Sequence, residues 1–231
     1  MTAAVAAACT ALGLVVGWLL DPVITRVPRK VSVLGPPSAD EPPSPTTRRA
    51  LVVLLCGALF GATGARFDDS WALPAYLVLA AALVALSAID LEHYLLPNRI
   101  VYPLTVAMIA LLGVASIGDD DIDAFGRGLL AGAIAFAVFF VLHVISPRSM
   151  GFGDVRLSFT LGLALGWLGW GELFLGIFLA FVYGAVVGIA LMLFFRRDRK
   201  QAVPFGPFLA AGTLTAILVG QAIITWYTNG G

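Results

Sequence analysis

The sequence predicts an all-α, polytopic membrane protein with about eight transmembrane helices and its N-terminus outside. Of the 231 residues, 60% are hydrophobic and only 12% are charged, whereas about 25% of a typical soluble domain is charged. Eight membrane helices of about 20 apolar residues each would use about 160 positions, so the chain is long enough. The apolar stretches are continuous rather than alternating, which disfavours a closed β-barrel. A formal net charge of zero excludes the broad basic surface of a nucleic-acid-binding protein.

Eight apolar runs define the expected spans, and the ends of each run are predicted to within about two to four residues. The first predicts a true span and not a signal peptide, because no Lys or Arg precedes it. The sixth is short, and we separate it from the seventh because together they exceed one bilayer thickness. The runs are 4–20, 50–65, 71–89, 100–117, 128–145, 157–170, 172–195 and 207–227.

The basic residues predict which way the chain crosses the membrane. If the N-terminus lies outside, twelve of the fourteen Lys and Arg residues fall in cytoplasmic loops, and only Arg66 and Arg127 fall on the other side. An excess of cytoplasmic Lys and Arg marks the orientation of helical membrane proteins. Because one missed span would scramble this distribution, it supports all eight spans together. The twelve are Arg26, Arg29, Lys30, Arg48, Arg49, Arg99, Arg148, Arg156, Arg196, Arg197, Arg199 and Lys200.

A proline-rich segment at about 29–48 separates the first two runs. Proline lacks an amide donor and blocks helix and strand alike, so we expect an extended cytoplasmic linker here. The rest of 1–231 is expected to form a single integral membrane domain. Cys9 and Cys56 lie inside apolar runs, which predicts that they pack as small hydrophobic residues. The prolines are Pro36, Pro37, Pro42, Pro43 and Pro45.

Two acidic residues stand out because polar groups at membrane depth are costly. Asp90 ends the third apolar run and Asp154 immediately precedes the sixth, so both are expected at the cytoplasmic membrane boundary, 64 residues apart. Pro97 is expected to stop the third helix. Gly151 and Gly153 allow a tight turn or a positive φ, which would place Asp154 at a bend. The two carboxyl groups could therefore converge.

Convergence would permit aspartic-protease chemistry. Two adjacent carboxylates cannot both ionise cheaply, so they share one proton. The ionised member can then activate a water while the protonated member polarises a carbonyl. Alternatively, each aspartate caps a helix or pairs with Arg99 or Arg156. Other catalytic motifs, including HExxH and GxSxG, are absent from the sequence. His143 is expected to be packed or hydrogen-bonded and not to bind a metal.

Four segments, in order along the chain, resemble those of the type IV prepilin peptidases, which are GxGD-type aspartic proteases of the bacterial inner membrane. Gly13–Pro28 is similar to the family's first span and basic loop. Ile89–Asn98 is similar to its first catalytic segment, Gly151–Leu157 to its GxGD segment, and Pro204–Leu209 to its PFGPF segment.

The resemblance implies that Asp90 and Asp154 are the catalytic pair. The implied reaction removes the short basic leader from type IV pilin or pseudopilin precursors, after a glycine, at the cytoplasmic membrane face. The implied partners are these precursors and the lipid bilayer, with no nucleic acid and no metal. Asp90, Glu92 and Asp154 are expected to attract a leader that contains Lys or Arg.

The sequence departs from the family pattern in two places. The linker stands where longer members carry a domain with paired CxxC motifs, and Trp18 and Asp21 stand where Ser and Asn are common. We therefore expect peptidase activity without N-methylation of the product, and no cofactor. S-adenosylmethionine would be needed only if a methyltransferase activity were retained.

Two other functions fit some of the same residues. A presenilin-like intramembrane protease shares GxGD, but its partner aspartate usually follows a tyrosine, whereas Ile89 precedes Asp90 here. A transporter could use the two aspartates as ion sites. Against this alternative, both acids are expected at the membrane edge, and no pair of broken helices is evident at mid-span.

Overall fold

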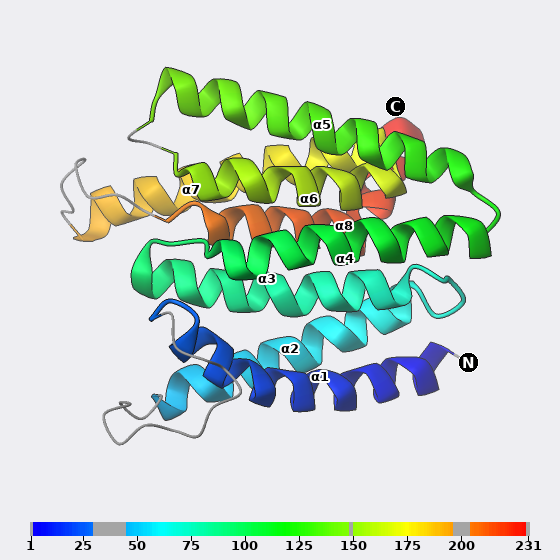
Figure 1. Cartoon of the computed structure of the whole chain (residues 1–231), viewed down its shortest axis with the longest axis horizontal. Coiled ribbons are helices and arrows are strands. Elements are labelled where there is room, and N and C mark those ends of the chain that lie inside the picture. The colour runs from blue at the N-terminus through cyan, green and yellow to red at the C-terminus, as the bar shows by residue number, and fades with distance from the viewer. Residues whose placement is uncertain (1, 30–44, 148–149, 196–203, 230–231) are drawn as a thin grey trace.

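The computed structural model describes residues 2–29, 45–147, 150–195 and 204–229, and this part of the chain is all-α, as predicted. Within these described residues, eight helices follow the eight expected apolar runs in order (Figure 1). They are α1 (Thr2–Arg26), α2 (Thr46–Arg66), α3 (Leu73–His93), α4 (Asn98–Gly118), α5 (Ile122–Ile145), α6 (Phe152–Leu168), α7 (Trp170–Phe195) and α8 (Gly206–Asn229).

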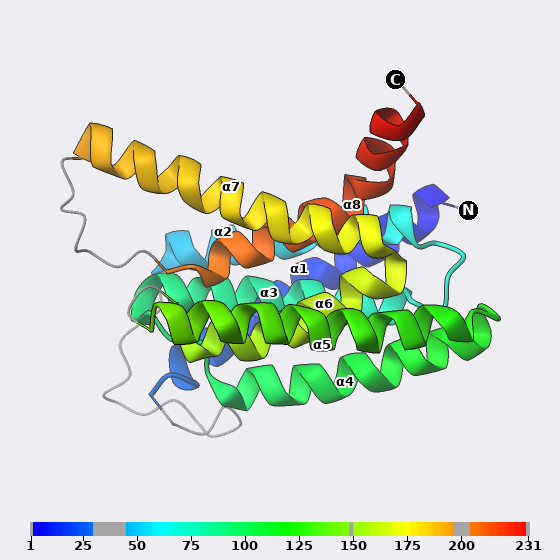
Figure 2. The same cartoon turned by 90° about the horizontal axis from the view of Figure 1, so that it is seen from above.

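The helices lie side by side and the chain runs back and forth along the bundle. The C-terminal ends of α1, α3, α5 and α7 lie at one end, on the left of Figure 1. We call this the Asp90 end, because Asp90 lies in the last turn of α3. The start of α1 and the last turns of α8 lie toward the opposite end. Seen from above, α7 diverges from its neighbours toward the Asp90 end (Figure 2).

Seven of the helices are long and apolar enough to cross a membrane, which indicates a multi-pass membrane protein. The exception in the described part of the chain is α6. Its 17 residues span about 25 Å, less than the roughly 30 Å of a bilayer's apolar core. The short sixth run of the sequence thus corresponds to a helix buried among the others. The orientation with the N-terminus outside stays a prediction.

Helix ends differ from the expected bounds where polar residues continue a helix beyond its apolar run. The first helix continues to Arg26, six residues past the expected end, and α5 begins at Ile122, six residues early. The α5 extension is possible because Asp121 accepts a hydrogen bond from the Ala124 amide at 2.9 Å, which caps the helix. Thr46 already lies in α2, so the end of the expected linker is helical, while its residues 30–44 lie outside the described part.

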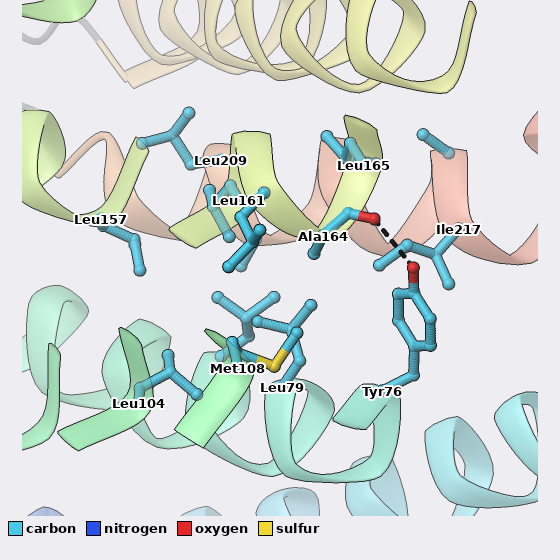
Figure 3. Packing of buried hydrophobic residues seen from close by; sticks show 14 of the residues in the cluster. Tyr76, Leu79, Leu104, Met108, Leu157, Leu161, Ala164, Leu165, Leu209 and Ile217 are labelled. Carbon is cyan, nitrogen blue, oxygen red and sulfur yellow. Dashed lines mark hydrogen bonds between the residues drawn. The ribbon is translucent and has the colours of Figure 1, made fainter. Parts of the chain in front are cut away.

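Buried contacts hold α6 against α3 and α4 (Figure 3). Met108 of α4 is fully buried in this cluster. The hydroxyl of the buried Tyr76, on α3, donates a hydrogen bond to the Ala164 carbonyl oxygen of α6 at 2.8 Å. A buried tyrosine hydroxyl needs such a partner. This bond therefore fixes how α3 and α6 face each other.

The far end of α6 is also held firmly. Arg127 of α5 donates hydrogen bonds to the carbonyl oxygens of Gly166 at 2.8 Å and Trp167 at 2.6 Å. These carbonyls belong to the last turn of the helix, which leaves such acceptors without partners inside the helix itself. Only Gly169 separates α6 from α7, so the connection at this end has no slack.

Glycines let two pairs of helices approach closely. A Cβ atom on Gly13 of α1 would lie 2.5 Å from the Cys56 carbonyl oxygen of α2. One on Gly162 of α6 would lie 2.8 Å from the Ala131 carbonyl oxygen of α5. Such small-residue contacts are typical of packed membrane helices. Cys56 and Cys9 are both buried and free, which confirms that they pack as small hydrophobic residues.

Candidate active site

Asp90 lies in the last turn of α3, and its side chain is fixed by a distant segment. The Gly206 amide, at the start of α8, donates a hydrogen bond to Asp90 Oδ2 at 3.0 Å. The residue is only 5% exposed. A Cβ atom on Gly206 would lie 2.7 Å from the same oxygen. Glycine is therefore required here, so that the backbone of α8 can reach the carboxylate.

The third helix ends at His93, so it does not continue past Pro97, as the sequence predicts. The next residue, Tyr94, adopts the left-handed conformation (φ 52°) that ends many helices. The Tyr94 amide donates to the Asp90 carbonyl oxygen at 2.9 Å and closes the last turn. Pro97 is the N-cap residue of α4, and its carbonyl oxygen accepts a hydrogen bond from the Val101 amide at 3.1 Å.

Asp154 lies in the first turn of α6, and not at a bend before the helix. Its Oδ2 accepts a hydrogen bond from the Gly151 amide at 3.2 Å, and its amide donates to the Gly151 carbonyl oxygen at 3.1 Å. Asp154 is 6% exposed. Its other oxygen, Oδ1, is buried without a hydrogen-bond partner among the described residues. One carboxylate oxygen thus holds the turn, and the other is left for a further partner.

The two glycines before Asp154 have different roles from those expected. Gly151 has a φ of −69°, which any residue adopts, and no described glycine lies in the left-handed region that favours glycine. Gly153 lies within the helix, and a Cβ atom on it would lie 2.8 Å from the Leu96 Cβ atom. The packing requires glycine at this position, because the segment between α3 and α4 lies directly against α6 and leaves no room for a side chain.

Asp90 and Asp154 lie close together, an arrangement that the sequence allowed beside the alternative of separate caps and ion pairs. Both line one cavity of about 570 Å³ at the Asp90 end, and their carboxyl groups interact electrostatically. The cavity is also lined by Val27, after α1, by Arg99 of α4, and by Phe205, which precedes α8. Segments from most of the chain therefore meet around the two acids.

The alternative of simple caps and ion pairs accounts for part of this arrangement. Asp154 does cap α6 through Oδ2. In the part of the chain that the structure describes, however, neither acid is paired with Arg99 or Arg156. Arg156 donates to Asn98 Oδ1 and stacks on the ring of Phe152, with its guanidinium carbon 4.5 Å from the ring centre. Arg99 and Arg156 line the same cavity, but among the described residues neither forms an ion pair with the two acids.

Glu92 does not join this site. It is not among the cavity-lining residues, and both of its carboxylate oxygens accept hydrogen bonds from Arg48, at 3.2 and 3.1 Å. The expectation that Glu92 attracts a basic leader therefore lacks structural support. The Arg48 contacts and the bond from Gly206 to Asp90 could not be predicted from local sequence patterns, since each joins residues far apart in the chain.

His143 is hydrogen-bonded, as expected. Its Nδ1 donates to the Met150 carbonyl oxygen at 2.8 Å. The described residues contain no group of three or more His, Cys, Asp or Glu side chains that could hold a metal ion. Among the described residues that line the cavity, the acidic side chains are those of Asp90 and Asp154.

Comparison with known proteins places this site in a family. The model of the type IV leader peptidase family matches residues 77–189, which include both aspartates. A prepilin leader peptidase/N-methyltransferase of Bacillus subtilis is 32% identical over 174 residues, covering 75% of this chain and 67% of the relative. The chain belongs to the type IV leader peptidase family.

Other members of the type IV leader peptidase family are similarly related. A prepilin leader peptidase/N-methyltransferase of Aeromonas hydrophila is 35% identical over 185 residues, 79% of this chain and 62% of the relative. One of Pseudomonas aeruginosa is 33% identical over 183 residues, 78% of this chain and 61% of the relative. The chain thus matches less than two thirds of the length of these two relatives. No solved structure matches it.

Proposed function

We propose that this protein is a membrane aspartic endopeptidase that cleaves the short basic leader from type IV pilin or pseudopilin precursors. The observation that carries the proposal is the convergence of two buried carboxyl groups, from α3 and α6, on one cavity. Membership of the type IV leader peptidase family supports the substrate class.

The two carboxyl groups divide the chemistry between them. The ionised one takes a proton from a water molecule, whose oxygen attacks the scissile carbonyl carbon. The protonated one donates a hydrogen bond and then its proton to the carbonyl oxygen, giving a tetrahedral diol. As the C–N bond breaks, the carboxyl group that gained the water's proton delivers it to the departing amine. The other carboxylate takes a proton from one diol hydroxyl, whose oxygen becomes the product carbonyl, and this restores the starting pair. The pair acts as one titrating unit, so neither role is assigned to one residue.

The Asp90 end is proposed to face the cytoplasm of a bacterium, with the protein in the inner membrane and its N-terminus outside. Six of the described basic residues belong to segments at this end, whereas Arg66 and Arg127 lie toward the other. This imbalance follows the positive-inside rule. The six are Arg26, Arg29, Arg48, Arg49, Arg99 and Arg156. A precursor would keep its apolar helix in the bilayer and present its leader to the cavity.

The test is cleavage by detergent-purified protein of a type IV pilin precursor whose Lys/Arg-containing leader ends in glycine. Asp90→Asn and Asp154→Asn should each abolish leader loss, measured by mass spectrometry, while the protein is still made and inserted. Asp123→Asn, which changes an exposed acid of α5 at the opposite end, should cleave normally. Normal turnover by either of the first two variants would disprove the dyad.

We propose peptidase activity without methylation, and therefore no cofactor. In this protein Trp18 and Asp21 contact the start of α2: the Arg49 guanidinium stacks on Trp18 at 5.2 Å, and Arg48 bonds Asp21 at 3.0 Å. The two residues that differ from the family's first motif, Trp18 and Asp21, thus make contacts within the protein. When S-adenosylmethionine is added to the cleavage reaction, the product should keep its unmethylated mass. A gain of one methyl group would contradict this part of the proposal.

A further inference from the structure

One arginine joins three helices at the Asp90 end. Arg48, in the first turn of α2, donates from Nη2 to Asp21 Oδ1 at 3.0 Å and to Thr25 Oγ1 at 2.7 Å, both on α1. From Nη1 it donates to both carboxylate oxygens of Glu92, on α3. Its side chain is only 14% exposed. An arginine suits this place because its planar fork can serve two carboxylates at once, which a lysine ammonium does less well.

The α3 end of this network lies next to the catalytic segment. Glu92 is two residues beyond Asp90 in the same last turn, which the Tyr94 amide closes. Beside it, Ile89 packs in a buried apolar cluster with Ile24 of α1. Two kinds of contact therefore hold the end of α3 against α1 and α2. One is the apolar packing of Ile89 inside the bundle, and the other is the pair of hydrogen bonds from Arg48 to Glu92.

We propose that Arg48 is a positioning residue for Asp90, holding the last turn of α3 so that the Asp90 carboxylate stays aligned with Asp154. Helix ends fray unless they are held, and the last turn of α3 precedes a segment that must reach Pro97. Arg48 acts through Glu92 and does not line the cavity. This inference rests on the proposed peptidase function, because alignment of the two acids matters only if they act together.

Arg49 provides a matched comparison. It is the next residue of the same helix and contacts Trp18 of α1, but within the described residues no hydrogen bond or ion pair joins it to α3. Loss of Arg48 and loss of Arg49 each remove one positive charge from the same turn of α2. Only the first releases Glu92.

The test compares Arg48→Met, Arg48→Lys and Arg49→Met in the full-length, detergent-purified protein, with the same pilin precursor as substrate. Because a displacement of about 1 Å can cost a factor of 100 in rate, Arg48→Met should lower kcat by about 10- to 100-fold. Its KM should change by less than about threefold, as expected for a residue that does not bind substrate. Arg48→Lys should recover part of the rate, and Arg49→Met should cleave like the parent protein.

Two further measurements separate positioning from general stability. Glu92→Gln should lower kcat less than Arg48→Met, and adding it to Arg48→Met should cost little more, because both act through one contact. Hydrogen exchange of the peptide that covers residues 86–95 should be faster in Arg48→Met than in Arg49→Met, whether or not any substrate is cleaved.

The outcomes are distinguishable. If the parent protein does not cleave the precursor, the proposed function fails, and the exchange experiment still decides whether Arg48 holds the turn. If the parent protein cleaves and Arg48→Met keeps its kcat, the positioning role is wrong. A raised KM at unchanged kcat, or equal losses in Arg48→Met and Arg49→Met, would also overturn it.

Discussion

The Gly206 amide donates a hydrogen bond to Asp90 Oδ2 at 3.0 Å, across 116 residues of sequence. This bond joins the start of α8 to the end of α3, and it exists only because position 206 has no side chain. The Pro-Phe-Gly-Pro-Phe segment and Asp90 are therefore parts of one site. The same close approach makes Gly206 a sensitive position for mutation.

Gly206→Ala should lower kcat by at least about tenfold, because its Cβ atom would lie 2.7 Å from Asp90 Oδ2 and must displace it. Steady-state cleavage of the pilin precursor measures this loss. The matched control is Gly188→Ala on α7, where a Cβ atom meets nothing within 4 Å. Equal activity of the two variants would show that Asp90 tolerates displacement.

Gly153→Ala should destabilise the protein by about 1–3 kcal/mol, since an added methyl group in a packed contact forces its neighbours apart. The contact is with the Leu96 Cβ atom, 2.8 Å from the added carbon. Thermal inactivation in detergent would report the change. Gly126→Ala, in open space on α5, should leave the inactivation temperature unchanged or raise it slightly, because alanine favours helix more than glycine does.

Tyr76→Phe should cost about 1 kcal/mol of stability, because it removes the hydrogen bond to the Ala164 carbonyl oxygen while keeping the ring. The same hydroxyl deletion at Tyr227, which is 80% exposed, is the control and should have no measurable effect. Comparison of thermal inactivation curves in one detergent tests both. A shift of equal size in the two variants would show that the Tyr76 bond adds nothing to stability.

The dependence of kcat/KM on pH should be bell-shaped. At low pH both carboxyl groups are protonated and no base remains, whereas at high pH both are ionised and no acid remains. The two apparent pKa values belong to the pair and not to either residue. The measurement should use a precursor without titrating groups near its cleavage site, so that the pH profile reports the ionisation of enzyme groups only. A rate that rises or falls only once across the range would argue against a shared proton.

The sequence predicted the helices and the two acids well, because both depend on local signals. A continuous run of apolar residues predicts a membrane-spanning helix, and Asp90 and Asp154 stand out at the ends of such runs. The helix ends were less predictable, since Asp121 caps α5 outside its apolar run. Contacts between distant segments, such as Arg48 with Glu92 or Gly153 with Leu96, leave no local signal. For the same reason, the roles of Pro97 and the two GxGD glycines were only partly foreseen.

Because α6 is short and held at its far end, it sets the position of Asp154 in the candidate site. Its far end is clamped by Arg127 and joined to α7 through Gly169 alone, so the number of residues between that clamp and Asp154 sets how far the second carboxylate reaches. One residue added to α6 would shift Asp154 by about 1.5 Å along the helix axis and turn it by about 100°. The position of Asp154 relative to Asp90 thus depends on contacts at the opposite end of α6.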